Sequence, residues 1–227
     1  MLVTIVGWII VMSGISCQRQ DDNHTPKGKK KENESNSSGA FNNAASSKEV
    51  DQMTRRDVSQ MDMSYCPFDY PLLKMQGKIG KEPLARVIYG RPHKKGRVIF
   101  GKDSSSLCRF GMPWRMGANE ATEIEFFSDA TFNHIPVKKG KYVIYCIPDE
   151  NAWNIRLNSN CYSWGLQMDS SLDVLKTNVP INRSDKTWED LTIFFHSSHS
   201  IHESYKEYLM VIAWDQTSVS IPIAWLN

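Results

Sequence analysis

Two segments of this chain concentrate the residue types that recognise small molecules. The first is residues 91–97 (RPHKKGR) and the second is residues 114–120 (WRMGANE). Guanidinium groups bind carboxylates and phosphates through paired hydrogen bonds, and an indole face packs against a sugar ring. We therefore predict one pocket for an anionic or hydroxyl-rich ligand, lined by Arg91, His93, Arg97, Trp114, Arg115, Asn119 and Glu120.

The second segment also has a purely structural interpretation. We expect Gly117 to adopt a positive φ and to form a turn that folds Glu120 back toward Arg115. The resulting ion pair either lines a pocket or only holds a loop against the core, with Trp114 as a core residue. Both interpretations remain open, because structural ion-pair networks imitate functional sites.

Signals of catalysis and of metal binding are weak. The sequence contains no nucleophile elbow, no P-loop and no Rossmann glycine pattern. His196, His199 and His202 have the spacing H-x-x-H-x-x-H, but they fall between two expected strands and are typical of a polar hairpin loop. A metal at these histidines is the alternative, although the spacing is no established zinc pattern. We predict neither a metal nor another cofactor.

Both segments resemble the bacterial domain-of-unknown-function 2911 family. The family pattern includes RPxxKGRxIFG, which residues 91–101 match, and WRTGANEAT, which residues 114–122 match except that Met116 replaces Thr. The resemblance extends over about residues 85–223. It implies an exported, β-rich bacterial protein, often a lipoprotein, and it implies no particular activity.

The first residues are typical of an export signal. An apolar run over residues 2–12 and the small residues before Cys17 have the order of a signal peptide, and the run is too short to span a bilayer. Gly-Ile-Ser-Cys resembles a bacterial lipobox, so we expect residues 1–16 to be a lipoprotein-type signal peptide and Cys17 to carry the lipid. An ordinary cleaved signal peptide without lipid is the alternative.

A polar linker follows the signal. Residues 18–62 contain few hydrophobic side chains and cannot bury enough surface to fold, so we expect residues 17–62 to be the lipid-attachment cysteine and a disordered linker. The expected location is the bacterial cell envelope, where a lipid-anchored chain faces the periplasm or the cell surface. A net charge of only +2 argues against a nucleic-acid partner.

Residues 63–227 have the pattern of an all-β domain. Short runs of alternating hydrophobicity recur between turn residues, which predicts a single two-layer β-sandwich or jelly-roll-like domain. Pro148 to Asn151 predict a hairpin turn. The expected strands are 85–89, 97–100, 122–127, 141–147, 153–158, 174–179, 191–195, 208–214 and 219–223. We expect Cys146 to be a buried thiol opposite about residue 153, and a Cys66–Cys108 disulfide remains open.

These observations favour a lipid-anchored binding module that does not turn over its ligand. The expected partners are the membrane, through the lipid, and a small molecule, a glycan or another envelope protein. A structural subunit of an envelope complex is the first alternative. A hydrolase that uses His93 or Glu120 as a base is the second.

Overall fold

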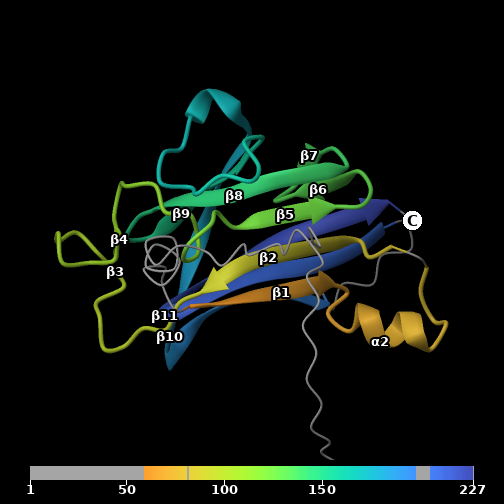
Figure 1. Ribbon diagram of the computed structural model, residues 1–227, viewed down its shortest axis with the longest axis horizontal. Coiled ribbons are helices and arrows are strands. Elements are labelled where there is room, and N and C mark those ends of the chain that lie inside the picture. Colours follow the sequence, from red (N-terminus) through yellow and green to blue (C-terminus); the bar gives the residue numbers. More distant parts are fainter. Residues whose placement is uncertain (1–58, 81, 198–204, 227) are drawn as a thin grey trace, which may run out of the picture. The chain divides into compact units, whose positions relative to one another are not determined.

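Strands make up most of residues 59–80, 82–197 and 205–226, which are the residues that the computed structural model describes (Figure 1). They confirm the all-β fold class. Nine strands form one sheet in the order β1-β2-β5-β8-β9-β10-β11-β6-β7, and every neighbouring pair is antiparallel. These strands are β1 (Gln60–Cys66), β2 (Ala85–Arg91), β5 (Glu123–Phe126), β6 (Ala130–Phe132), β7 (Ile135–Val137), β8 (Gly140–Pro148), β9 (Ala152–Asn158), β10 (Asp173–Ser197) and β11 (Tyr205–Leu226).

The remaining elements are short. β3 (Phe100–Gly101) and β4 (Cys108–Arg109) form a small parallel sheet in the long connection between β2 and β5. The helix α2 (Tyr70–Met75) lies between β1 and β2, and the 3-10 helix η1 (Ser170–Leu172) precedes β10. No helix among the described residues is both long enough and apolar enough to cross a membrane.

The long strands β10 and β11 carry the sheet from one layer to the other. Residues 173–180 of β10 pair with β9, whereas the part of β10 from Ile181 onward pairs with β11. The register shifts on both sides of Trp188, and such irregularities bend a strand. The layers then meet across the core, where the Tyr89 hydroxyl on β2 accepts a hydrogen bond of 3.1 Å from the Ile193 amide on β10.

Alternation along the strands decides which side chains form the core. Thr122, Ile124 and Phe126 are fully buried, whereas Glu123 and Glu125 between them are partly exposed, as their alternation predicts. β8 is an interior strand between β5 and β9, and its turn to β9 closes with the Asp149 amide on the Ala152 carbonyl. The hairpin expected at residues 148–151 is therefore confirmed.

Several sequence-based expectations need correction. β1 begins at Gln60, so the boundary expected at residue 63 falls inside a strand. The strand expected at residues 97–100 is reduced to β3, because a tight turn occupies residues 94–97. Cys146 lies opposite Ile155 rather than residue 153, although it is a buried thiol as predicted. Cys66 and Cys108 are both buried free thiols, so the disulfide that remained open is not formed.

Candidate functional site

The chain continues beyond β2 as an extended segment that joins the two layers. His93 forms an isolated antiparallel bridge with Asp190 of β10, the Lys94 amide donates to the Glu189 carbonyl, and the Leu191 amide donates to the Pro92 carbonyl. Successive side chains of an extended segment point to opposite sides. Arg91 and His93 consequently line one hollow, while Pro92 between them lines a second.

A tight turn at residues 94–97 ends this segment. The Arg97 amide donates to the Lys94 carbonyl over 3.1 Å, and the two central residues, Lys95 and Gly96, have φ values of 51° and 69°. Two successive positive φ values define a type I′ turn, for which glycine in the second place is the usual choice. The Arg97 side chain is fixed to the same turn, because Nε donates to the Lys94 carbonyl (3.0 Å) and Nη2 to the His93 carbonyl (2.6 Å).

The loop of residues 114–121 packs directly on β2. A Cβ atom on Gly90 would lie 2.1 Å from the Ala118 carbonyl oxygen, so only glycine permits this approach. The expected positive φ at Gly117 is wrong: Met116 (φ 56°) and Asn119 (φ 62°) adopt it instead. The buried Met116 side chain and the hydrogen bond from the Thr122 hydroxyl to the Met116 carbonyl hold this conformation.

The two motifs meet at the second hollow, which we name the arginine hollow. Its volume is about 230 Å³, and Arg97 and Arg115 contribute the charged side chains of its wall. The other lining residues are Pro92, Leu107, Pro113, Trp114, Gly117, Ala118, Gly165, Leu166 and Trp214. This lining combines two guanidinium groups with apolar side chains and exposes polar and apolar surface in similar amounts, which suits an anionic group attached to a partly apolar or ring-shaped body.

Arg97 is the uncompensated charge of the arginine hollow. Its side chain is exposed, its hydrogen bonds go to backbone carbonyls, and no carboxylate of the described residues forms an ion pair with it. Arg115 is held from the opposite wall, where Nη1 donates to the Trp164 carbonyl over 3.3 Å. Both guanidinium groups are thus positioned by backbone before any ligand arrives.

Trp114 is mainly a core residue. It is 8% exposed, its ring stacks on Trp214 with centroids 5.9 Å apart, and it meets Phe100 and Trp153 edge-on. A sugar ring needs an open indole face, and these neighbours cover the faces of Trp114. The residue therefore forms part of the floor of the arginine hollow rather than a stacking platform.

The first hollow, which we name the lysine hollow, lies on the other side of the extended segment. It measures about 360 Å³ and is lined by Ser59, Gln60, Arg91, His93, Lys95 and Asp190. The Arg91 guanidinium lies 3.2 Å from Asp62, whereas His93 Nδ1 is 3.0 Å from Asp190 and His93 Nε2 is 3.7 Å from Glu189. The His93 ring thus contacts two carboxylates, and His93 Nδ1 is hydrogen-bonded to Asp190.

The structure thus divides the seven predicted site residues among three places. Arg91 and His93 face the lysine hollow, and Arg97, Trp114 and Arg115 face the arginine hollow. Asn119 is buried and Glu120 is partly exposed, and neither lines these hollows. Sequence reasoning missed Lys95, and the only local signal was Gly96, because glycine is usual in the second central place of a type I′ turn.

The predicted histidine cluster is only partly described. His196 is exposed near the end of β10, and His199 and His202 lie outside the described residues. Among the described residues, no three His, Cys, Asp or Glu side chains gather as metal ligands.

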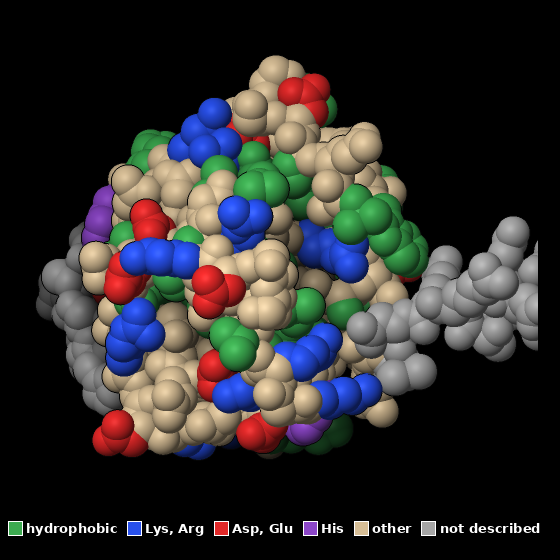
Figure 2. Space-filling view, turned by 90° about the vertical axis from the view of Figure 1, so that its left-hand side faces the viewer, with side chains coloured by type: hydrophobic (Ala, Val, Ile, Leu, Met, Phe, Trp, Pro, Cys, Tyr) green, Lys and Arg blue, Asp and Glu red, His purple; other side chains and the backbone are tan. Residues whose placement is uncertain are grey.

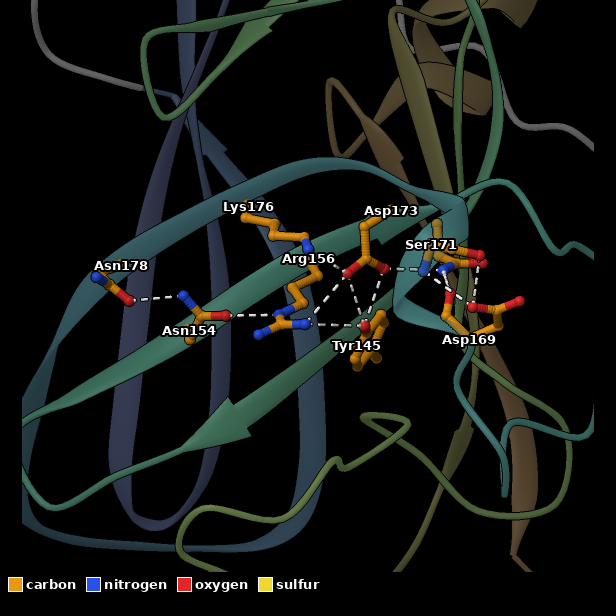
Figure 3. A network of polar contacts seen from close by, with 9 residues as sticks. Tyr145, Asn154, Arg156, Asp169, Ser171, Asp173, Lys176 and Asn178 are labelled. Carbon is orange, nitrogen blue, oxygen red and sulfur yellow. Dashed lines mark hydrogen bonds and ion pairs between the residues drawn. The ribbon is translucent and has the colours of Figure 1, made fainter.

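A polar network on the outer face of β8, β9 and β10 is a structural feature (Figure 3). The fully buried Asp173 carboxylate accepts hydrogen bonds from Tyr145 and Asn158 and forms ion pairs with Arg156 (3.1 Å) and Lys176 (3.3 Å). Burial alone would raise the pKa of Asp173, but the hydrogen bonds from Asn158, Tyr145 and Lys176 outweigh it and hold this pKa below its ordinary value. A carboxylate with so many partners stabilises the fold and has little capacity left for a ligand.

The fold and the paired motifs define a class of β-rich domain with a cationic hollow at one end. The chain belongs to the family described as "Protein of unknown function (DUF2911)", whose model matches residues 71–223. Both motifs lie inside this match, so the expected family is confirmed. Neither a curated protein nor a solved structure matches the chain.

Proposed function

We propose that this protein is a non-catalytic binding module, held at the bacterial cell envelope by a lipid on Cys17. Its ligand is an anionic small molecule or an acidic sugar, bound in the arginine hollow. The sequence of residues 1–17 supports the export and the anchor, since an apolar run precedes a lipobox-like cysteine. The anchor would leave the domain facing the periplasm or the cell surface.

The position of Arg97 is the main support for an anionic ligand. Arg97 is fixed by two backbone carbonyls, lines the arginine hollow together with Arg115, and has no carboxylate partner among the described residues. A guanidinium oriented in this way is ready to form paired hydrogen bonds with a carboxylate or phosphate, and little ordering is left for the binding step.

The test is calorimetric titration of the full chain with galacturonate and with inorganic phosphate. We expect at least one of these probes to bind, and we expect Arg97→Ala and Arg115→Ala each to weaken the affinity by about tenfold or more, the value of a charged hydrogen bond. Arg109→Ala is the matched control, because Arg109 is an exposed arginine that lines neither hollow. Binding that survives both hollow variants, or no binding of either probe, contradicts the proposal.

A structural role in an envelope complex is the second candidate. Exposed apolar side chains surround the arginine hollow: Leu166 is 73% and Leu107 is 47% exposed, and Val98, whose carbonyl accepts from the Leu107 amide, is 57% exposed. Exposed apolar surface of this kind is typical of contacts between proteins. This candidate predicts that Leu107→Ser with Leu166→Ser abolishes cross-links to a defined envelope protein in cells, whereas Val174→Ser, at an exposed position on β10, preserves them.

A further inference from the structure

The charged turn at residues 94–97 separates the two hollows and presents a cation to each. Lys95 lines the lysine hollow and Arg97 lines the arginine hollow. The two Cα atoms are two residues apart along the chain and so lie within about 7 Å of one another. Lys95, Gly96 and Arg97 are all exposed, so the surface between the hollows is open to solvent.

Some cationic side chains of residues 91–97 are paired with carboxylates, and others are not. Lys94 pairs with Asp215 over 2.5 Å and Arg91 pairs with Asp62. Lys95 and Arg97, in contrast, have no carboxylate partner among the residues that the structure describes. Figure 2 faces this end of the domain and shows Lys and Arg side chains spread over it, with Asp and Glu side chains among them.

The type I′ turn fixes the backbone that carries both cations. The hydrogen bond between Arg97 and Lys94 closes the turn, and the bond from Arg97 Nη2 to the His93 carbonyl fixes the side chain that faces the arginine hollow. The extended segment that precedes the turn is itself fixed by the hydrogen bonds of Pro92 and Lys94 to β10. The backbone therefore sets the positions of both residues and of the Arg97 guanidinium, whereas the exposed Lys95 side chain can adjust its ammonium group to a ligand.

We propose that the two hollows are subsites for one ligand that carries repeated anionic groups, one group held at Arg97 and the next at Lys95. This inference rests on the proposed function and names its ligand more closely: an oligomeric anion rather than a single acidic residue. Linking two weakly bound groups makes the second contact intramolecular, so affinity rises steeply with the number of groups. A carboxylated oligosaccharide and an oligophosphate share this chemistry.

The experiment compares galacturonate with trigalacturonate, and inorganic phosphate with triphosphate, by titration of the full chain at one ionic strength. The longer probe of at least one pair is expected to bind about tenfold to a hundredfold more tightly than its single unit. The pair that shows this gain identifies the source of the anionic groups. Lys95→Ala is expected to bring the ratio between the affinity for the longer probe and the affinity for the single unit close to one.

Lys139→Ala is the matched control, because Lys139 is exposed and lies in the connection between β7 and β8, outside both hollows. If Lys139→Ala reduces the gain as much as Lys95→Ala does, the gain comes from overall charge and the two-subsite proposal is wrong. If the single unit binds and the longer probe binds no better, this proposal is also wrong while the arginine hollow stands. If neither unit nor oligomer binds, the proposed function itself fails.

Discussion

Arg156 and Arg97 show two different uses of an arginine in this chain. Arg156 is paired with the buried Asp173 within a network of tyrosine, asparagine and lysine side chains, so its charge stabilises the sheet (Figure 3). Arg97 is fixed by carbonyls alone and keeps its charge available. Paired charges of the first kind contribute to the fold, whereas an oriented and unpaired guanidinium is what anion recognition requires.

Asp173→Asn is expected to lower the free energy of unfolding by about 1–3 kcal/mol at pH 7, because the amide leaves Arg156 and Lys176 without their buried counter-charge. Chemical denaturation measures this change. Asp185→Asn, on an exposed part of β10, is the control and is expected to change stability by less than about 0.5 kcal/mol.

The same residue predicts a pH dependence. The pKa of Asp173 is lower in the folded chain than in the unfolded chain, because hydrogen bonds and ion pairs to the charged form outweigh the opposing effect of burial. Its stabilisation is therefore complete above the unfolded value of about 3.9 and is lost as pH falls through the lower folded value. The difference between the native chain and Asp173→Asn should shrink below about pH 3.9, and a constant difference would contradict the assignment.

The buried thiols give a further prediction at the residue scale. Burial raises the pKa of Cys66, Cys108 and Cys146 well above the ordinary thiol value, so the reactive thiolate is scarce at neutral pH. These three cysteines are expected to resist iodoacetamide in the folded chain and to react fully in guanidinium chloride, as mass spectrometry of the peptides would show. Rapid labelling of Cys146 in the folded chain would contradict the described packing.

At the scale of elements, the arginine hollow depends on how closely the 114–121 loop approaches β2. Gly90→Ala places a methyl group against the Ala118 backbone and is expected to lower the free energy of unfolding by about 1–3 kcal/mol, because backbone cannot move aside as a side chain can. Anion affinity should fall with it, since Arg115 lies on the displaced loop. Gly80→Ala, where an added Cβ meets open space, should change neither quantity. Equal stabilities of the two variants by chemical denaturation would exclude the tight contact.

The sequence predicted the elements whose signals are local. Clean alternation at Ile124 and Phe126 located β5, and turn residues after β8 located the hairpin to β9. The sequence also divided β10 and β11 into two strands each, because their bends interrupt the alternation while the backbone remains extended. The positive φ at Met116 was beyond local reasoning, since burial of its side chain and a hydrogen bond from Thr122 stabilise it.

The residues of the candidate site could be predicted from the sequence only in part. Residue types located the two motifs, and both reach the arginine hollow as Arg97 and Arg115. The sequence could not show that the extended segment would direct Arg91 and His93 away from Arg97, because that division depends on pairing with Asp190, almost a hundred residues further on. Such long-range pairing leaves no mark on a short motif.

At the scale of the whole molecule, the proposed protein has a folded β domain and, near the other end of the chain, a lipid anchor. The family match covers residues 71–223 and therefore bears on the domain rather than on the signal and linker. A lipid on Cys17 followed by a polar linker would hold the arginine hollow near a membrane while the domain stayed in water. Such an arrangement suits a protein that captures anionic molecules at the envelope.

Cys17→Ser tests this arrangement directly. When the full gene is expressed in a bacterial host, the native chain is expected to enter the detergent phase on Triton X-114 partitioning, because acyl chains on Cys17 add apolar surface. Cys17→Ser should move to the aqueous phase, and Cys161→Ser, which changes a cysteine of the folded domain, should partition as the native chain does. Mass spectrometry of the first peptide should show a mature chain that starts at Cys17 and carries the lipid mass. Equal partitioning of the native chain and Cys17→Ser would exclude the lipid anchor and leave the ligand proposals to stand on the hollows alone.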